Sequence, residues 1–478
     1  MNNNLLHRLF LLAALLTGGC AIDQKNEVTQ YRKVIDNNTP AGVTVASGEV
    51  VTLTDALRLA NQNTESLSVQ GEDYLQALID KDKAFAAFLP TLNLAPTYAL
   101  NSAGNATFGT ITHTLQVPAD GQINLFNGFR DFHALRAADA TIEQQKQLVL
   151  DAQQTILLDV AQTYYQTLTD EQSVDVLKNS LVLQQANLDN MNAQAKVGTV
   201  SPLVVAQAES EVAQTLVSLN QSNASVANDR AMLAYLVSAP IENNPLRDDF
   251  QPPGSVEPVD QLKAQAEAGR QDLLAANAAV KSARENVEVA FGQYYPTLAV
   301  NLNYILYSET NVVDGVNGGG AWTGLFSVNL PIFTAGLIHA DVRTAWSQFR
   351  QAALTQAQLR RNIDQLVETA FTNYQLSLTQ LNELQVEVKA AHDAYYYAEA
   401  QYKAGTEIYL NVLTAQNSLL STQLQLTTAQ FNTKTAYFSL LRAMGELNLE
   451  SGVSATRPSE EEIRNLATQP ATQPIRGQ

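Results

Sequence analysis

Residues 87–92 read Ala-Phe-Leu-Pro-Thr-Leu, and residues 293–298 repeat this pattern as Gln-Tyr-Tyr-Pro-Thr-Leu. A second pair of similar segments lies further along, where Gln-Ala-Lys-Val-Gly-Thr at 194–199 returns as Gln-Tyr-Lys-Ala-Gly-Thr at 401–406. The first pair is offset by 206 residues and the second by 207, so the two landmarks keep their spacing in both copies. The sequence therefore predicts that one structural unit has been duplicated.

Each Pro-Thr-Leu segment opens a run in which apolar residues alternate with small or polar ones. Residues 91–100 place Leu and Tyr on one face and Asn, Ala and Thr on the other, and residues 297–307 follow the same pattern. Each run is followed by a loop rich in Gly and Asn and by a return strand, which gives β-hairpins at about 91–126 and 297–333. Strands of about ten residues with one apolar face are typical of transmembrane barrels. Two ordinary hairpins half-buried on a soluble core are the alternative.

The number of strands carries a further expectation. Four strands cannot close a membrane barrel, because about eight is near the observed minimum and an open edge in lipid leaves backbone groups unsatisfied. If the strands span a membrane, the chain must therefore form an oligomer.

The sequence also predicts two very long helices, at about 129–196 and 337–403, because neither stretch contains proline or an interior glycine. Return helices are expected at about 202–238 and 409–445. Seam positions recur in steps of three and four, which predicts packed antiparallel coiled-coil helices. In the two copies these positions are Val174, Leu177, Leu181, Gln184, Leu188, Met191 and Ala195, and Leu381, Leu384, Val388, Ala391, Tyr395, Ala398 and Tyr402. Many small and polar residues lie around the seam. They indicate either a layer of helices with one face in contact with water or a long solvated helical hairpin.

The N-terminus has the layout of a secretory signal at 1–19, with basic residues, a short apolar run and small residues before Cys20. This stretch resembles a bacterial lipoprotein signal, in which the cysteine is lipidated after cleavage; an ordinary secretory signal is the alternative. Ala21 favours delivery to the outer membrane in such proteins. We expect residues 20–50 to be an extended, lipid-anchored segment.

The composition excludes several functional classes. A formal charge of −18 makes nucleic acid an unsuitable partner. The five histidines are dispersed, the only cysteine is Cys20, and no phosphate-binding glycine loop occurs, so we expect no catalytic site, no metal site and no cofactor.

The domain plan follows from these elements. Repeat 1 is expected at 51–240 and repeat 2 at 259–448, each as helix, hairpin, long helix and return helix. A Pro-rich linker at 241–258 joins them, and the polar tail at 449–478 has a disordered composition. Thr52 and Asp55 form a capping-box pattern at the start of repeat 1.

Several further motifs carry a family resemblance. They are the Pro-Thr-Leu strand entries, Leu-Phe-Asn-Gly at 125–128, Pro-Ile-Phe-Thr-Ala-Gly at 331–336, and the stretch from Tyr402-Lys-Ala-Gly-Thr to Leu410-Asn-Val-Leu-Thr-Ala-Gln416. Together they resemble the outer membrane efflux protein (TolC) family over about residues 50–448. The resemblance implies a homotrimer in which four strands per chain build one twelve-stranded outer-membrane β-barrel, continued by a long periplasmic α-helical coiled-coil barrel.

The resemblance also implies partners and sites. Members of the family act as exit ducts for inner-membrane pumps, joined through a periplasmic adaptor that docks at the helical tips. Carried over to this chain, the docking residues are Lys196, Gly198, Thr199, Lys403, Gly405 and Thr406. The family's gate often contains Asp after the second tip, whereas this chain has Leu410, Asn411 and Thr414 there. We therefore expect a neutral constriction, or simple helix packing, at these three residues.

Three functions remain open from the sequence. The first is an outer-membrane duct for efflux of small molecules, and the second is the same duct in type I protein secretion. The third is a periplasmic coiled-coil scaffold whose hairpins never enter lipid.

Overall fold

The computed structural model describes residues 24–36, 45–103, 110–310 and 320–451. The chain is mainly helical with a small sheet, which confirms the predicted fold class at this level. It divides into two compact units. Unit 1 comprises the described residues within 1–37, 69–149 and 272–359. Unit 2 comprises the described residues within 38–68, 150–271 and 360–478.

The same series of helices occurs twice along the chain. The first half contains α3 (Leu53–Asn63), α4 (Glu65–Ala86), α5 (Arg130–Lys196) and α6 (Pro202–Val237). The second half contains α7 (Val259–Gly269), α8 (Gln271–Phe291), α9 (Leu337–Lys403) and α10 (Tyr409–Met444). Helices α5 and α9 both have 67 residues, and α6 and α10 both have 36.

The helix expected before each hairpin is divided in two. Thr64 and Arg270, which follow α3 and α7, have extended backbone angles of φ −68°, ψ 121° and φ −67°, ψ 126°. The Arg270 side chain is buried and donates from Nη1 to the Ala443 carbonyl at 3.1 Å. The capping box predicted at the start of α3 is confirmed, because the Asp55 N–H donates to the Thr52 hydroxyl and the Thr52 N–H to the Asp55 carboxylate.

Unit 1 contains one antiparallel sheet in the order β2–β4–β6–β7, with β3 also paired to β4. Its strands are β2 (Thr91–Leu94), β3 (Thr97–Ala103), β4 (Thr110–Asn127), β6 (Thr297–Thr310) and β7 (Ala321–Asn329). The two hairpins join through β4 and β6, where Ile123 lies opposite Val300. The sheet is therefore four strands wide, with β2–β3 at one edge and β7 at the other.

Two strands differ from the sequence prediction. The first expected strand is interrupted at Pro96, because proline has no N–H for the strand ladder. The last strand ends at Asn329 rather than at Phe333. Pro331 interrupts the pairing there, and Phe333 is 88% exposed.

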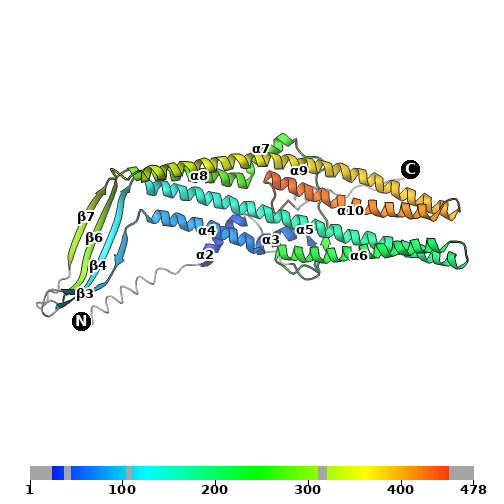
Figure 1. Cartoon of the computed structure of the whole chain (residues 1–478), viewed down its shortest axis with the longest axis horizontal. Coiled ribbons are helices and arrows are strands. Elements are labelled where there is room, and N and C mark those ends of the chain that lie inside the picture. Colours follow the sequence, from blue (N-terminus) through cyan, green and yellow to red (C-terminus); the bar gives the residue numbers. More distant parts are fainter. Residues whose placement is uncertain (1–23, 37–44, 104–109, 311–319, 452–478) are drawn as a thin grey trace, which may run out of the picture. The chain divides into compact units, whose positions relative to one another are not determined.

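The helices of unit 1 follow the same order as the strands to which they connect. Lys81 on α4 forms an ion pair with Asp139 on α5 at 2.8 Å. His133 Nδ1 on α5 lies 2.7 Å from Glu285 Oε2 on α8. Helices α8 and α9 share an apolar cluster of Val287, Ala290, Ile338, Val342 and Ala345. The helical order is therefore α4–α5–α8–α9, as Figure 1 also shows.

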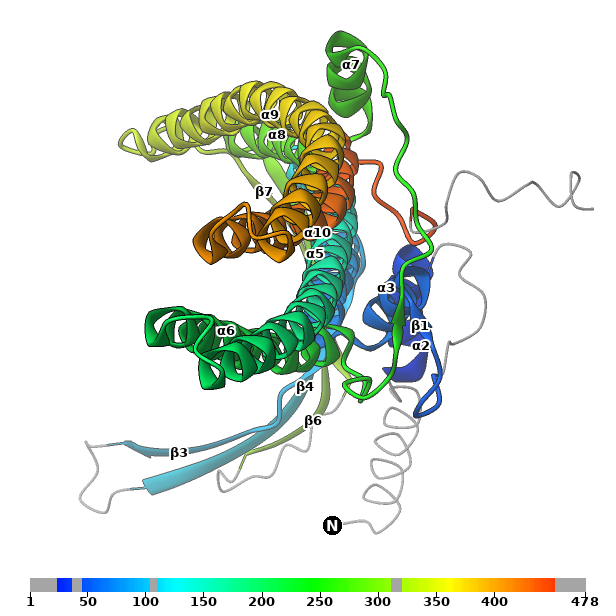
Figure 2. The same cartoon turned by 90° about the vertical axis from the view of Figure 1, so that its right-hand side faces the viewer.

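In unit 2 four helices form one curved layer in the order α9–α10–α5–α6 (Figure 2). Tyr165 on α5 stacks on Phe431 of α10 with ring centroids 6.1 Å apart. The Ser222 hydroxyl on α6 donates to the Asp170 carbonyl on α5 at 3.5 Å, and the Thr433 hydroxyl on α10 donates to the Ser377 carbonyl on α9 at 3.3 Å.

The segment between the two repeats is held by side chains of unit 2. Strand β5 (Leu246–Arg247) pairs in parallel with β1 (Val51–Thr52). The buried Tyr164 hydroxyl donates to the carbonyl of Val51 or of Arg247, at 2.9 and 2.8 Å. Burial raises the pKa of Tyr164 far above its usual value, so the hydroxyl keeps its proton and remains a donor. The linker is therefore an integral part of unit 2.

The N-terminal segment corrects an expectation. Instead of being extended throughout, it contains α2 (Gln24–Ile35), whose Tyr31 and Ile35 are buried. Tyr31 packs over Gly71 of α4, where an added Cβ would lie 2.4 Å from the ring. The pattern of α2 is amphipathic, so Tyr31 and Ile35 can be buried while its charged residues stay in water. The signal at 1–19, Cys20 and residues 452–478 lie outside the described residues.

Candidate functional site

One face of the sheet in unit 1 is apolar and exposed. On β6, Leu302 and Tyr304 are 50% and 40% exposed. Trp322 lies opposite Tyr304 and Phe326 opposite Val300 on the neighbouring strand β7. Further exposed apolar residues of the strands are Leu92, Leu94, Tyr98, Leu100, Leu306 and Val328. An exposed apolar band of this kind is unfavourable in water and matches the outer surface of a membrane barrel.

The opposite face of the sheet carries polar side chains alongside the exposed Leu325 of β7. Asn303 on β6 donates from Nδ2 to Asp120 Oδ1 on β4 at 2.6 Å. Asn301 lies opposite Gln122, and the Ser327 hydroxyl on β7 bonds to the backbone of β6. A sheet with one apolar and one polar face can separate lipid from water.

Both edges of the sheet are open within the described part of the chain. Strand β7 pairs only with β6, and β2 and β3 pair only with β4. In lipid each unpaired N–H or C=O group at these edges would cost at least about 2 kcal/mol of free energy. A membrane location therefore requires a further strand at each edge.

Helices α5 and α9 end in the same turn. Gly198 and Gly405 have φ +78° and +75°, in the left-handed region that glycine tolerates. The Thr199 N–H donates to the Gln194 carbonyl at 3.0 Å, and the Thr406 N–H donates five residues back in the same way. These are Schellman-type C-caps, which satisfy the last carbonyl groups of each helix.

The six residues predicted to dock an adaptor are all exposed: Lys196, Gly198, Thr199, Lys403, Gly405 and Thr406. A Cβ added at either glycine would meet no atom within 4 Å, so open space surrounds both turns. Lys403 Nζ lies 2.7 Å from Glu399, and this hydrogen bond raises the pKa of the Lys403 ammonium. The structure thus places the six residues at two free helical tips.

Helices α5 and α6 form one helical hairpin, and α9 and α10 form a second. The two helical hairpins pack together just behind their tips. An apolar cluster joins Met191 and Ala208 of the first hairpin to Tyr409 and Val412 of the second. The Tyr402 hydroxyl lies 3.5 Å from the Met191 sulfur. Most predicted seam positions near this cluster are buried or half-buried, so the seam prediction identified the packed face of α5 and α9.

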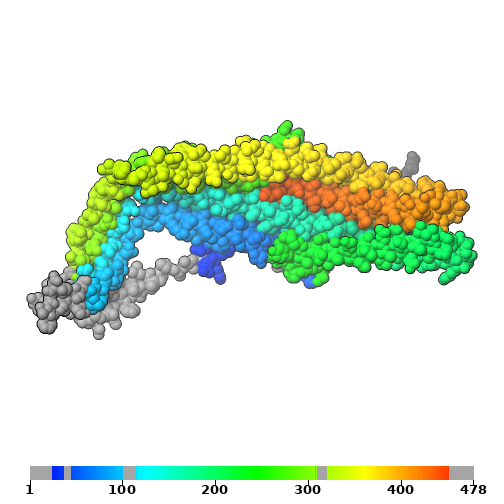
Figure 3. All heavy atoms as spheres, viewed as in Figure 1, coloured from blue at the N-terminus to red at the C-terminus, as the bar shows by residue number. Residues whose placement is uncertain are grey.

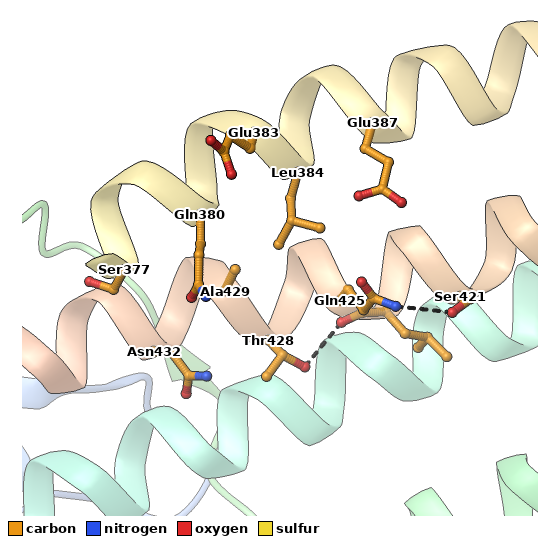
Figure 4. A pocket seen from close by; sticks show the side chains of 11 residues that line it. Ser377, Gln380, Glu383, Leu384, Glu387, Ser421, Gln425, Thr428, Ala429 and Asn432 are labelled. Atoms are coloured by element: carbon orange, nitrogen blue, oxygen red, sulfur yellow. Dashed lines mark hydrogen bonds between the residues drawn. The ribbon is translucent and has the colours of Figure 1, made fainter. Parts of the chain in front are cut away.

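A polar groove of about 560 Å³, which no sequence pattern predicted, lies between α9 and α10 (Figure 4). Glu383 and Glu387 project from α9 with no basic side chain among the lining residues. The Gln425 amide on α10 donates to the Ser421 hydroxyl at 3.2 Å. The other lining residues are Ser377, Gln380, Leu384, Leu424, Thr428, Ala429 and Asn432. Their spacing along each helix resembles an ordinary solvated face, which is why the sequence pattern did not reveal the groove.

The candidate gate residues lie on the first turns of α10. Leu410 is 49% exposed, and the Thr414 hydroxyl donates to its carbonyl at 2.8 Å. Asn411 Nδ2 donates to Glu407 Oε1 at 2.6 Å. None of the three gate positions carries a carboxylate, but Glu407, which the family pattern did not reveal, lies one turn before Asn411 and contacts it.

The described residues contain no group of three or more His, Cys, Asp or Glu side chains placed to bind a metal. Among the helices of the described ranges, none combines the length and apolar character needed to cross a membrane.

Comparisons with known proteins agree with this geometry. The sequence pattern described as "Outer membrane efflux protein" matches residues 56–238 and 262–446. The chain is 25% identical to outer membrane efflux protein BepC of Brucella suis over 68% of this chain and 71% of BepC. It is 24% identical to outer membrane protein TolC of Escherichia coli over 82% of this chain and 83% of TolC.

Solved structures show the same fold. The CmeC outer membrane channel of Campylobacter jejuni superposes with a TM-score of 0.75, covering 91% of this chain and 95% of CmeC at 14% identity. CusC superposes with a TM-score of 0.75, covering 85% of this chain and 96% of CusC at 18% identity. The predicted family is confirmed: this chain belongs to the outer membrane efflux protein family.

Proposed function

We propose that the chain is the outer-membrane exit duct of a tripartite efflux system. In this role it conducts substrates passively from an inner-membrane pump and a periplasmic adaptor to the exterior. The observation that carries the proposal is the four-stranded sheet, with its exposed apolar face, its polar face and its two open edges. The relatives are named as efflux proteins and efflux pump components. Their names favour a role in efflux over a role in protein secretion.

The open edges support a homotrimer. Three copies, each contributing a sheet four strands wide, would give a closed barrel of twelve strands in which every edge is paired. The apolar faces would then contact lipid and the polar faces would line a water-filled interior. Closed rings of identical copies are the usual form of soluble and membrane oligomers.

The helical tips are the proposed docking sites for the adaptor. This proposal is supported by the repeated Gly-Thr cap, which forms two similar, exposed turns at the ends of the two packed helical hairpins. Repeated surfaces on one chain can bind equivalent parts of several adaptor copies. The helical layers behind the tips form the proposed periplasmic coiled-coil barrel.

The proposed gate comprises Leu410, Asn411 and Thr414, with Glu407 added from the structure. The Asn411 amide holds the Glu407 carboxylate at 2.6 Å, so a change at either residue alters the polarity of this turn. We therefore expect Glu407→Gln to change the cation preference of the closed pore without disturbing the fold of α10.

The proposed location is the outer membrane, with Cys20 as the lipidated residue. An acyl chain contributes about 0.8 kcal/mol per buried methylene group, so a multiply acylated Cys20 would attach the N-terminus firmly. Mass spectrometry of the mature N-terminus tests this assignment directly.

The deciding experiment measures single-channel conductance of the detergent-extracted protein in planar bilayers, together with its mass in solution. A trimer that inserts and conducts supports the duct. A monomer or dimer that needs no detergent and gives no conductance refutes it, and would favour the periplasmic scaffold.

A further inference from the structure

Unit 1 ends at two helices, α4 and α9, that each have an exposed face. On α4 the side around Gly71 is covered by Tyr31 of α2, whereas Glu72, Gln76 and Ile79 are exposed. Helix α4 precedes one edge of the sheet and α9 follows the other edge, with α5 and α8 between them. In the space-filling view α9 (yellow) and α4 (blue) lie on opposite margins of this layer (Figure 3). A ring of copies, on which this inference rests, brings α9 of one copy beside α4 of the next.

The interior of the chain contains a matching junction between α5 and α8. Helix α9 corresponds to α5 with an offset of 207 residues, because they begin at Leu337 and Arg130. Helix α4 corresponds to α8 with an offset of 206, because they begin at Glu65 and Gln271. The junction between copies, α9 against α4, is therefore the counterpart of the junction within the chain, α5 against α8.

The junction within the chain fixes which positions face each other. Arg136 on α5 lies 4.0 Å from Glu285 on α8, and the Thr141 hydroxyl lies 3.1 Å from the Ser282 hydroxyl. By the offsets, Arg136 corresponds to Arg343 and Glu285 corresponds to Ile79. Arg343 of one copy is therefore expected opposite Ile79 of the next.

One heptad further along the same register, opposite charges meet. Arg350 lies seven residues after Arg343, and Glu72 lies seven residues before Ile79, so the antiparallel helices place Arg350 opposite Glu72. Both side chains are exposed, and neither has a hydrogen-bond or ion-pair partner in the part of the chain that the structure describes. Each charge thus lacks a partner in its own copy and has an opposite charge at the expected position in the next.

The exposed face of α9 also has the shape of a helix-packing surface. A hollow on α9 is lined by the small residues Ala340, Thr344 and Ser347, together with Arg343, Trp346, Gln348 and Arg350. Small residues at this spacing allow a neighbouring helix to approach closely. The facing side of α4 has exposed Val69 and Ile79, which are suitable to fill such a hollow.

We propose that α9 of one copy packs against α4 of the next with Arg350 paired to Glu72, and that this pair sets the register between copies. The partner is a second copy of this chain. The same register places Gln348 opposite Gln76, because these are the counterparts of Thr141 and Ser282.

Disulfide trapping in membranes of cells that express the full chain tests the register. The double variant Gln76→Cys with Gln348→Cys should form crosslinked dimers and trimers under mild oxidation, because its counterpart side chains touch within the chain. The control variant Gln76→Cys with Thr355→Cys is displaced by one heptad, about 10 Å along the helix, and should form none. The wild-type chain controls for crosslinking through Cys20.

The outcomes separate this inference from the proposed duct. If the protein is a trimer by mass but the Gln76 and Gln348 variant does not crosslink, or the displaced control crosslinks equally well, the register is wrong and the duct remains. If the protein is a monomer, both proposals fail.

Charge reversal tests the ion pair itself. Arg350→Glu should lower the temperature at which the detergent-solubilised trimer dissociates, and adding Glu72→Arg should restore it. Arg343→Glu makes the same charge change at a position expected to face Ile79, so Glu72→Arg should not restore that variant. Equal behaviour of the two pairs would overturn the proposed pairing.

Discussion

The linker between the repeats is expected to depend on one buried ion pair. Lys434 on α10 is 5% exposed, and its ammonium donates to the Asp248 carboxylate and to the Phe250 carbonyl. It also lies 5.6 Å from the centre of the Tyr165 ring and 5.8 Å from that of Phe431. The perturbation is Asp248→Asn, which removes the negative charge and keeps the size of the side chain.

The magnitude follows from the unequal burial of the two charges. Asp248→Asn leaves the buried Lys434 ammonium without its counter-ion, and the loss of one partner of a buried pair costs about 3–5 kcal/mol. Lys434→Met instead leaves the Asp248 carboxylate, which is 27% exposed and can be hydrated. That variant loses charge-assisted hydrogen bonds and leaves the Phe250 carbonyl unpaired, at about 2–3 kcal/mol. We therefore expect Asp248→Asn to be the more damaging change.

Hydrogen exchange measured by mass spectrometry on the peptide covering 246–250 tests this expectation in the intact protein. A loss of about 3 kcal/mol in local stability accelerates exchange through local opening on the order of 100-fold, since each 1.4 kcal/mol is a factor of ten. Arg360→Gln is the control, because Arg360 is 57% exposed in its pair with Glu267 and surface pairs contribute about 1 kcal/mol or less.

Two results would refute the reasoning. Exchange in Asp248→Asn that is no faster than in Arg360→Gln would show that the ion pair does not hold the linker. Faster exchange in Lys434→Met than in Asp248→Asn would show that burial of the ammonium does not dominate.

Two other predictions concern the helices and the strand–helix junction. Burial and then the Asp170 side chain raise the pKa of Asp229 from 3.8 to about 6, so its contribution to stability is full below pH 3.8 and is lost as the pH rises through about 6. Protection of α6, measured relative to the intrinsic exchange rate at each pH, should therefore fall between pH 5 and 7 by an amount equivalent to about 1 kcal/mol, since the site is partly hydrated. Asp229→Asn should abolish this loss of protection. Gly128→Ala should prevent assembly of membrane-inserted trimer, because its Cβ would lie 2.2 Å from the Gly292 carbonyl oxygen. Gly336→Ala has a similar positive φ in open space and should lose only about 1 kcal/mol; equal trimer yields of the two variants would contradict the steric argument.

Features that repeat along the sequence could be predicted from it. The seam positions were identified by spacing alone, and Val174, Leu177 and Met191 are 5%, 4% and 4% exposed. The mainly helical fold with its small sheet and the family membership were also predicted correctly. Periodicity succeeds here because a long helix or strand must present the same face to its neighbour at every turn.

Features that depend on a single distant contact could not be predicted. Lys434 and Asp248 are 186 residues apart in the sequence, and no local pattern indicates that they meet. The division after α3 occurs at Thr64 without glycine or proline. Helix α2 is held by the burial of Tyr31 over the distant Gly71 and by the burial of Ile35. Glu407 was missed for a related reason, because its relevance comes from a hydrogen bond to Asn411 and not from the family pattern.

The duplication explains why one chain can supply both kinds of junction that a closed ring requires. The junction of α5 with α8 is covalently fixed within the chain, so its polar contacts, such as His133 with Glu285, form as the unit folds. In the proposed ring, the junction of α9 with α4 forms between copies that meet in solution or in the membrane, where any register of two long helices is initially possible. The pairing of Arg350 with Glu72 favours its register over displacements by part of a heptad, because those leave both charges unpaired. On this argument, Arg350 and Glu72 contribute to the register between copies, whereas the pair of Arg136 with Glu285 forms within a single folding chain.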